Sequence, residues 1–484
     1  MKSRYRIIFL IVIFAGVFSC VKDEFITDTD ANLGFSDDTI MFDTVFTSLG
    51  STTEHLKIYN PYNENILISS LFIAGGKESN FRINVDGLIS DSFKDIEILG
   101  NDSVYIFVEV TIDPNGLNSP MVIQDSIVFI VNGNMQDVDL VAYGQDFNLF
   151  NGVEIQSQTW ENNKPYLVYN SVLVDSLSTL TIEAGTQIHF HKRSSMLVKG
   201  TLIVNGTVDD PVYFQGDRLE SFYDDKPGQW GSWIEFEEGG AYLLGGIHFL
   251  AGSKDNYINY AVIKNAIKGI QADTLASYDI PTLTLLNTRI ENMSYAGIYA
   301  QGSSILAANC VVANCGSHAV ALMIGGSYEF YHCTIANFYR YGTRTSPSVV
   351  LNNFYIYENT IFPRPLDKAL FSNCIIYGGL QTEIEFIDSV PGITVPAAFN
   401  YLFDHCIIKV DTMNISNEDH FKYILKNVDP RFVSVYNYDF HLDTLSPAKD
   451  YGDLEMSQLL PFDLDNKNRL SDDGPDLGAY ERIE

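Results

Sequence analysis

The sequence predicts an all-β protein in which a parallel β-solenoid follows a small antiparallel β-sandwich. Short strand patterns without a long amphipathic helix, a motif that recurs every 22 to 27 residues, and a change of pattern near Gly152 support this prediction. The chain has 484 residues, of which 46% are hydrophobic. One compact core does not serve so long a chain unless the core grows by repetition.

Copies of a six-residue motif define the solenoid. Four copies begin at Tyr260, Asn287, Asn309 and His332, with spacings of 27, 22 and 23 residues. A period in this range suits one coil of a solenoid. Two later copies begin at 373 and 405, after 41 and 32 residues, so longer loops or a missed coil intervene there.

Alternation within the motif assigns its side chains to two faces, because successive side chains of a strand point to opposite sides. Position two carries small side chains and thiols, and position four carries β-branched aliphatic side chains, so both are expected to face inward. Position six is asparagine in four copies, which predicts an amide ladder that closes a turn. The three columns are Ala261, Thr288, Cys310, Cys333, Cys374 and Cys406; Ile263, Ile290, Val312, Ile335, Ile376 and Ile408; and Asn265, Asn292, Asn314 and Asn337.

The cysteines are predicted to be free, buried thiols. Without Cys20 their number is odd, and four of the remaining five share the inward column. Neighbouring coils are separated by about 4.8 Å, whereas a disulfide needs Cβ atoms about 3.8 Å apart. No Cys-x-x-Cys spacing occurs that would favour a metal site.

Two segments resemble parts of known β-helix proteins. Residues 179–186, 198–207, 211–214 and 228–230 resemble the opening coils of bacterial right-handed β-helix repeat proteins. This resemblance implies a right-handed parallel β-helix over 152–440. Residues 440–442, 446–448, 463–466 and 475–481 resemble the terminal segment of secreted bacterial β-helix proteins. It implies that 441–484 completes the last coils and covers the open end, as solenoids require.

Residues 33–146 form a separate unit. Period-two alternation recurs in short runs bounded by Gly, Asn, Asp or Pro, which predicts an antiparallel β-sandwich. Residues 47–50, 56–60 and 81–83 resemble the immunoglobulin-like modules related to the ciliary ASH domain. The resemblance implies a spacer rather than a catalyst.

The N-terminus carries an export signal. A basic start, an apolar run over 7–18 and Ser19-Cys20 predict a signal peptide over 1–19. Residues 17–20 resemble the lipobox of bacterial lipoproteins, which implies acylation of Cys20 and permanent attachment to a membrane. Lys22, Asp23 and Glu24 resemble the surface-export signal of Bacteroidota lipoproteins, with a solvated charged linker as the alternative. We expect a tether over 20–32 and an outer-membrane protein that faces the exterior.

The charge pattern restricts partners and catalysts. A net charge of -31 argues against nucleic acid. Lys264, Arg289 and Glu291 occupy outward positions on two consecutive coils, where lyases and hydrolases of this fold place acids and bases, but an exposed ion-pair cluster is the favoured interpretation. Asp463 and Asp465 are candidates for calcium, with an Asx turn as the alternative.

The sequence therefore favours a non-catalytic binding or adhesion protein, with polysaccharide or another surface molecule as its partner. Aromatic clusters in or beside the coils are suited to stacking on sugars, although such side chains also pack in cores. A polysaccharide lyase or glycoside hydrolase, and a purely structural surface component, are the alternatives. The oligomeric state is left open.

Overall fold

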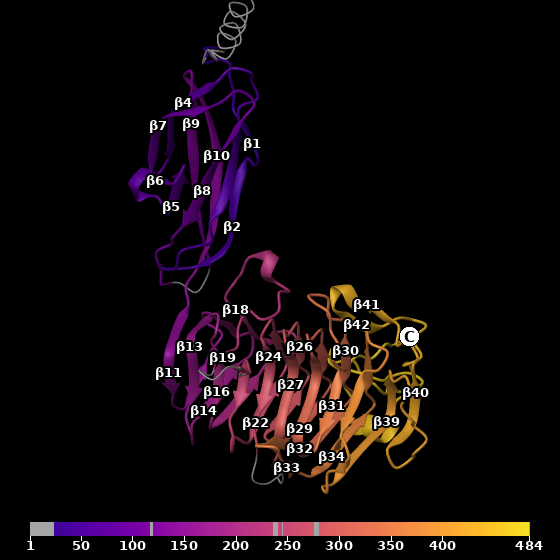
Figure 1. The fold of residues 1–484 in the computed structure, drawn as a ribbon. Helices are drawn as coiled ribbons and strands as arrows, with labels where there is room; N and C mark the ends of the chain where they lie inside the picture. Colours follow the sequence, from indigo (N-terminus) through magenta and orange to yellow (C-terminus); the bar gives the residue numbers. More distant parts are fainter. Residues whose placement is uncertain (1–23, 117–119, 236–240, 244, 275–279, 484) are drawn as a thin grey trace, which may run out of the picture. The chain divides into compact units, whose positions relative to one another are not determined.

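The computed structural model describes residues 24–116, 120–235, 241–243, 245–274 and 280–483. The chain divides into two compact units after Asp146, and each is described separately. Both are built from β-strands (Figure 1). No helix in the described ranges has the length and apolar character needed to cross a bilayer.

The first unit is a β-sandwich of two five-stranded sheets. Side chains from both sheets share one buried core, which contains Leu56, Ile68, Val108 and Phe129. The pairing is antiparallel as predicted, except that β10 pairs with β2 in parallel. One sheet has the order β1 (Gly34–Phe35), β3 (Glu54–Tyr59), β8 (Ser103–Val110), β5 (Phe81–Val85), β6 (Leu88–Ser90), and the other β2 (Thr39–Phe46), β10 (Asn134–Gln145), β9 (Met121–Val131), β4 (Ile66–Ile73), β7 (Ser92–Ile98).

The described part of the expected tether is packed against the sandwich. The Asn65 N–H donates to the Glu24 carbonyl, and the Asn132 side chain donates to the carbonyls of Ile26 and Asp28. Ala31 is buried in the core. Residues 24–32 of the expected tether therefore lie on the sandwich, where Ile26 and Ala31 add apolar surface to its core.

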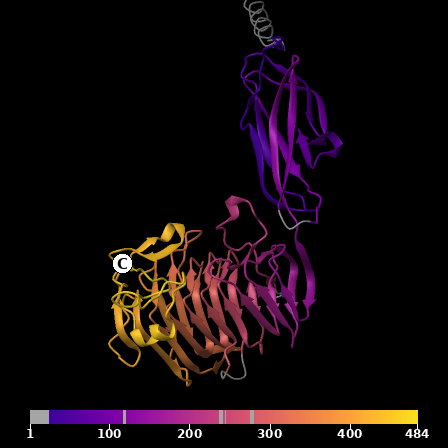
Figure 2. The same ribbon diagram turned by 180° about the vertical axis from the view of Figure 1, so that it is seen from behind.

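The second unit is a right-handed parallel β-helix with three sheets (Figures 1 and 2). Several strands pass a corner and pair in two sheets: β11 (Asn148–Ile155), β13 (Tyr166–Val174), β27 (Ala296–Ala308), β29 (His318–Tyr331), β39 (Phe399–Ile408) and β40 (Phe421–Lys426). The first sheet adds β15 (Gln187–Phe190), β18 (Val212–Gly216), β23 (Ala261–Lys264), β26 (Arg289–Glu291), β28 (Val311–Ala313), β30 (Thr334–Asn337) and β35 (Ile375–Gly378).

The second and third sheets complete each coil. The second adds β16 (Met196–Val198), β21 (Ile247–Phe249), β24 (Lys268–Ala272), β31 (Val349–Asn352) and β36 (Ile384–Ile387). The third adds β12 (Gln158–Trp160), β14 (Thr179–Glu183), β17 (Thr201–Asn205), β22 (Asn256–Asn259), β25 (Leu283–Leu286) and β34 (Leu366–Ser372).

Columns of like side chains fill the interior. The cysteines at 310, 333, 374 and 406 are fully buried free thiols, and Ile290 and Ile335 of the neighbouring column are also buried. Phe330, Phe371, Phe403 and Phe421 stack along the same axis, with ring centroids 4.8 to 5.6 Å apart. Equivalent side chains therefore contact each other from coil to coil.

The prediction of an asparagine ladder at position six of the motif is wrong in its position. At position six the backbone forms the ladder: the N–H groups of Asn265, Asn292 and Asn314 donate to carbonyls of the next coil. The side chains bind turns instead, as Asn314 and Asn337 accept backbone N–H bonds. The amide ladder lies at the preceding corner, where Asn309 donates to Asn287 at 3.0 Å and Asn287 to Asn259 at 2.8 Å.

Backbone conformation favours asparagine at both corners, and at position six Asn265, Asn292 and Asn314 have φ between 54° and 66°. The first residue of all six motif copies has a φ between 47° and 55°, in the left-handed region. Asparagine and histidine tolerate that region better than most residues. The corner residues are Tyr260, Asn287, Asn309, His332, Asn373 and His405.

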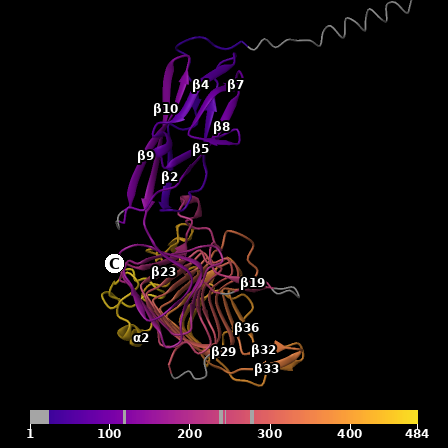
Figure 3. The same ribbon diagram turned by 90° about the vertical axis from the view of Figure 1, so that its left-hand side faces the viewer.

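The C-terminal segment lies beside the coils, which corrects the expectation that it covers the open end (Figure 3). Its Phe440, Leu464 and Ala479 pack on Val311 and Ala313, on the outer side of the first sheet. Leu442, Ala448 and Leu477 pack on Ile375 and Ile407. Small and aliphatic outward side chains at these coils require a cover. The part that packs here begins before residue 441, with β41 (Phe432–Ser434) and β42 (Asp439–Leu442), and includes α2 (Leu454–Leu459).

We predict that the Ile335→Ala substitution lowers the free energy of unfolding of the β-helix by about 2–5 kcal/mol, because it leaves a cavity in a fully buried column. Thr181→Ala, at a half-exposed outward position, is the control and should change it by less than about 1 kcal/mol. Chemical denaturation followed by circular dichroism measures both. Equal effects of the two substitutions would contradict the inward assignment.

Candidate functional site

Of the three candidate catalytic residues on the first sheet, Arg289 and Glu291 form an ion pair and Lys264 lies beside it. Arg289 and Glu291 pair at 2.8 Å, and Lys264 is the register partner of Glu291. Glu291 is buried, which corrects the expectation of a fully exposed cluster. Burial disfavours the charged Arg289, but attraction by Glu291 outweighs it, so the pKa of Arg289 is raised. A guanidinium held charged in this way is a poor general base.

The two nominated aspartates bind protein donors. Asp463 is buried and accepts backbone N–H bonds from Lys467 and Glu481, both at 2.6 Å, so its carboxylate joins two separate stretches of the C-terminal segment. Asp465 accepts from His441 at 2.8 Å and pairs with Lys467 at 3.3 Å. In the described part of the chain no group of three or more His, Cys, Asp or Glu residues has a geometry suited to a metal ion.

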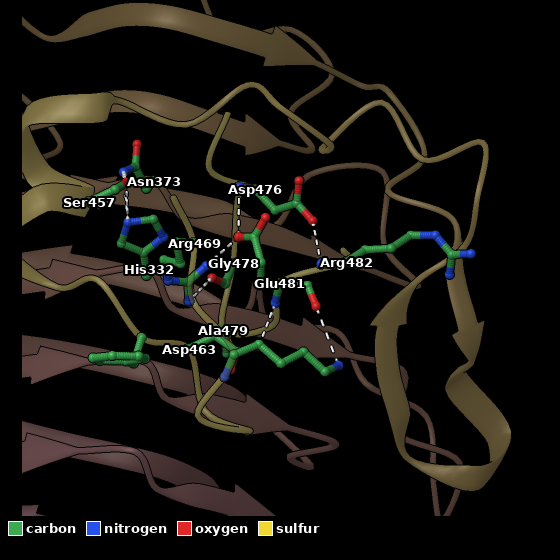
Figure 4. A network of polar contacts seen from close by, with 12 residues as sticks. His332, Asn373, Ser457, Asp463, Arg469, Asp476, Gly478, Ala479, Glu481 and Arg482 are labelled. Carbon is green, nitrogen blue, oxygen red and sulfur yellow. Dashed lines mark hydrogen bonds and ion pairs between the residues drawn. The ribbon is translucent and has the colours of Figure 1, made fainter. Parts of the chain in front are cut away.

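A buried polar network attaches the C-terminal segment to the coils (Figure 4). Arg469 is fully buried, pairs with Glu481 at 3.3 Å and donates to the Asn309 side chain at 3.1 Å. His332 contacts Ser457 at 2.9 Å. Burial, followed by repulsion from Asp476, raises the pKa of Glu481 to about 8. This network joins the amide ladder to the segment that covers it.

The lipidation and export residues Cys20, Lys22 and Asp23 lie outside the described residues. Glu24 is described and exposed, at the start of the segment that packs on the sandwich.

Sequence reasoning missed a polar cluster on the outside of the second sheet. His248 contacts Asp273 at 2.8 Å, Gln271 donates to the same carboxylate, and Lys268 donates to Gln271 at 2.9 Å. Burial lowers the pKa of Lys268 to about 8. Its members lie on two coils, between the motif copies, so no repeat drew attention to them. Because His248, Lys268 and Gln271 are all buried, the cluster presents little surface to a polymer.

The outer side of the third sheet is the open face of the β-helix. One outward column crosses nine coils in register, and each of its residues is at least partly exposed. From Thr181 to Leu370 the residues flanking it along the strand are buried. By contrast, Val311 on the first sheet and Ala321 on the second are covered. The column consists of Thr159, Thr181, Ile203, Tyr257, Thr284, Leu306, Glu329, Leu370 and Leu402.

A shallow hollow lies toward the C-terminal end of the open face. It is lined by Lys368, Leu370, Asn400 and Leu402, among others. Beside it Lys368 pairs with Glu329 at 2.9 Å, and the Tyr331 hydroxyl also donates to Glu329. Burial raises the pKa of Glu329, but these two donors outweigh it and the pKa is lowered.

The open face combines hydroxyl, amide and aromatic side chains. A second outward column beside the first adds Asn205, Asn259 and Tyr331. Repeated side chains about 4.8 Å apart suit a long ligand that crosses several coils. This face was not predicted, because the six-residue motif lies on the first sheet. Of the aromatic residues clustered at 328–331, Tyr328 and Phe330 belong to the core and only Tyr331 points outward.

The comparisons with known proteins support the fold. A family model described as "Right handed beta helix region" matches residues 245–411. No curated protein matches the chain.

Several solved structures resemble a part of the chain. They include a family 123 glycoside hydrolase from Clostridium perfringens (TM-score 0.18, 10% identity, 25% of this chain and 26% of that chain). A second is the periplasmic chaperone SfaE (TM-score 0.17, 13% identity, 24% of this chain and 58% of that chain). A third is the E. coli chaperone DraB (TM-score 0.17, 10% identity, 24% of this chain and 55% of that chain). The chain thus spans 26% to 58% of their lengths, and such TM-scores carry no assignment of fold or function.

We predict that attachment of the C-terminal segment weakens as the pH rises. An ordinary Glu has a pKa of about 4.3. Because Glu481 has a raised pKa of about 8 in the folded chain, the stability from its protonated form is full below about pH 4 and is lost as the pH rises through about 8. Glu481→Gln removes this titration, so the thermal unfolding temperature should change less between about pH 4 and about pH 8 than in the unsubstituted chain. The exposed Glu455→Gln substitution serves as control. An unchanged pH profile in Glu481→Gln would contradict the assignment.

Proposed function

We propose that the chain is an outer-membrane lipoprotein whose β-helix binds a polysaccharide along the open face of the third sheet, without cleaving it. The observation that carries this proposal is the outward column that stays uncovered over nine coils. A polymer with a repeating unit meets a surface with a repeating spacing. Hydroxyl and amide groups supply hydrogen bonds, and Tyr257 and the leucines supply contact with the apolar faces of sugar rings.

Two features support binding rather than catalysis. On the open face the acidic Glu329 is held ionised by Lys368 and Tyr331, which suits a hydrogen-bond acceptor better than a proton donor. On the first sheet Arg289 is neutralised by Glu291, and the adjoining coils are covered by the C-terminal segment. A polymer has no free path across the nominated acid and base.

The open face is tested with a blocking substitution. Thr284→Arg places a long charged side chain at the middle of the column and should weaken binding of an extended oligosaccharide at least about tenfold, because the ligand cannot pass it. Gln187→Arg makes the same change on the first sheet and serves as control. Binding of the mature chain to a glycan array, followed by titration of the positive glycans, measures the effect. Equal binding by both variants, or release of unsaturated sugar, would contradict the proposal.

The lipid anchor is tested separately. Cys20→Ser removes the thiol that would be acylated, so the chain should move from the detergent phase to the aqueous phase on phase separation. Substituting Lys22, Asp23 and Glu24 by Ala should keep the lipid and reduce labelling of the protein on intact cells. A Cys20→Ser chain that stays in the detergent phase would contradict lipidation at this residue.

A further inference from the structure

The outer side of one sandwich sheet carries an unusual set of exposed rings. In the sheet that contains β3 and β8, Leu56, Ile58, Ile106 and Val108 point into the core, and the alternate residues point outward. Tyr59, Tyr105 and Phe107 are 38%, 44% and 44% exposed, and Ile89 of β6 is 71% exposed. Exposed apolar side chains gathered in one place mark interaction surfaces more often than scattered ones do.

The strand register brings these side chains together. Lys57 pairs with Tyr105, His55 with Phe107, and Asn84 with both Phe107 and Ile89. The rings of Tyr105 and Phe107 are 6.5 Å apart and nearly parallel, at 20°. We call this surface the aromatic face; it consists of His55, Lys57, Tyr59, Arg82, Asn84, Ile89, Tyr105 and Phe107.

Polar groups line two hollows in and beside the aromatic face. The first is lined by Thr53, Asn84, Ile89, Phe107 and Glu109, together with Arg82. Arg82 and Ile89 also line the second hollow, with Lys77 and Ser90. Each hollow therefore has an apolar wall and a positively charged side chain, together with one carboxylate, Glu109 in the first and Asp91 in the second.

The charge of the aromatic face differs from that of its domain. Between Glu24 and Asp146 the sequence has four Lys and Arg residues against twenty Asp and Glu residues. Of the four cations, Lys57 and Arg82 are on this face, with the Lys57 Nζ 4.9 Å from the Tyr59 ring and 5.4 Å from the Tyr105 ring, and Lys77 lines the hollow beside it. The carboxylates of Glu109, the register partner of Arg82, and of Asp91 lie in the same hollows. Cations that lie close together on the surface of an acidic domain attract an anionic ligand to that place.

The opposite side of the sandwich provides a comparison within the same domain. Its outward residues on β2 and β10 include Met41, Met135 and Tyr143, which are also exposed. The charged residues beside them are Asp43, Asp137 and Asp139. Apolar exposure occurs on both sides, and the combination of rings with cations occurs on the aromatic face.

We infer that the aromatic face binds an acidic saccharide, one whose sugar rings carry carboxylate or sulfate groups. Flat aromatic rings stack on the apolar faces of pyranose rings, and Lys57 and Arg82 lie at the right surface to meet the anionic substituents. Asn84 and Thr53 supply hydrogen bonds to hydroxyl groups. This inference goes beyond the proposed function, since it gives a ligand site to a domain expected to be only a spacer.

The inference is tested on the mature full chain with three anionic probes: oligogalacturonate, oligoalginate and a sulfated heparan oligosaccharide. The uncharged control is fully methyl-esterified oligogalacturonate, which has the same rings. Isothermal titration should detect at least one anionic probe, with at least about tenfold weaker binding of the ester, and affinity should fall as salt is raised.

Paired variants separate the two contributions. Tyr105→Ala with Phe107→Ala should weaken binding of the anionic probe at least about tenfold by removing the stacking surface. Lys57→Gln with Arg82→Gln should weaken binding of the anionic probe until its affinity equals that of the ester. Met41→Ala with Tyr143→Ala, on the opposite side, should leave both unchanged. Circular dichroism checks that each variant is folded, which is expected because all six side chains are on the surface.

Several outcomes would overturn the inference. These are failure of all three anionic probes to bind, equal binding of the ester and the acid, or equal binding of a polyglutamate peptide, which would show charge attraction without sugar recognition. Loss of binding in the Thr284→Arg chain and not in the Tyr105→Ala, Phe107→Ala chain would place the site on the β-helix instead. Failure of the β-helix proposal leaves the results for the aromatic face unaffected, because the two sets of variants are on different domains.

Discussion

The β-helix depends on one constraint: backbone hydrogen bonds hold each coil about 4.8 Å above the last, so a residue has its structural equivalent directly above it. This explains why the interior consists of columns rather than a mixed core. A thiol stacks on a thiol, and phenylalanine on phenylalanine from Phe330 to Phe421. It also keeps the thiols apart, because parallel side chains at this spacing are too far from each other for a disulfide.

The same constraint aligns the outward side chains of successive coils, so that one kind of residue at an outward position produces a continuous surface of that kind. Where outward residues are small and aliphatic, as at Val311, Ala313 and Ala336, a continuous apolar surface forms and another part of the chain has to cover it. The C-terminal segment does so, and the buried Arg469 fixes it to the corner ladder through Asn309. Where aliphatic outward residues are interspersed with threonine, tyrosine and glutamate, as from Thr159 to Leu402, the surface stays open and is available to a ligand.

The two units offer different kinds of surface. The open face of the β-helix is long, regular and poor in unpaired charge, with Lys368 and Glu329 neutralising each other. The aromatic face of the sandwich is short and has cations among its rings. A protein with a net charge of -31 repels most polyanions, so cations placed beside exposed rings give selectivity for ligands that contribute sugar contacts as well as charge.

The sequence by itself determined the columns. Period-two alternation within a repeated motif is a local property, so it identified the inward Cys310, Cys333 and Ile335 and the fold class before any coordinates. It could not place the amide ladder, because position one and position six are both corners with asparagine in the left-handed region, and only the contacts between coils decide which amides face each other. The outer surfaces were likewise decided by the tertiary structure. Whether Glu291 is exposed, where residues 441–484 lie, and which face stays open all depend on contacts between segments more than 100 residues apart, which no local pattern records.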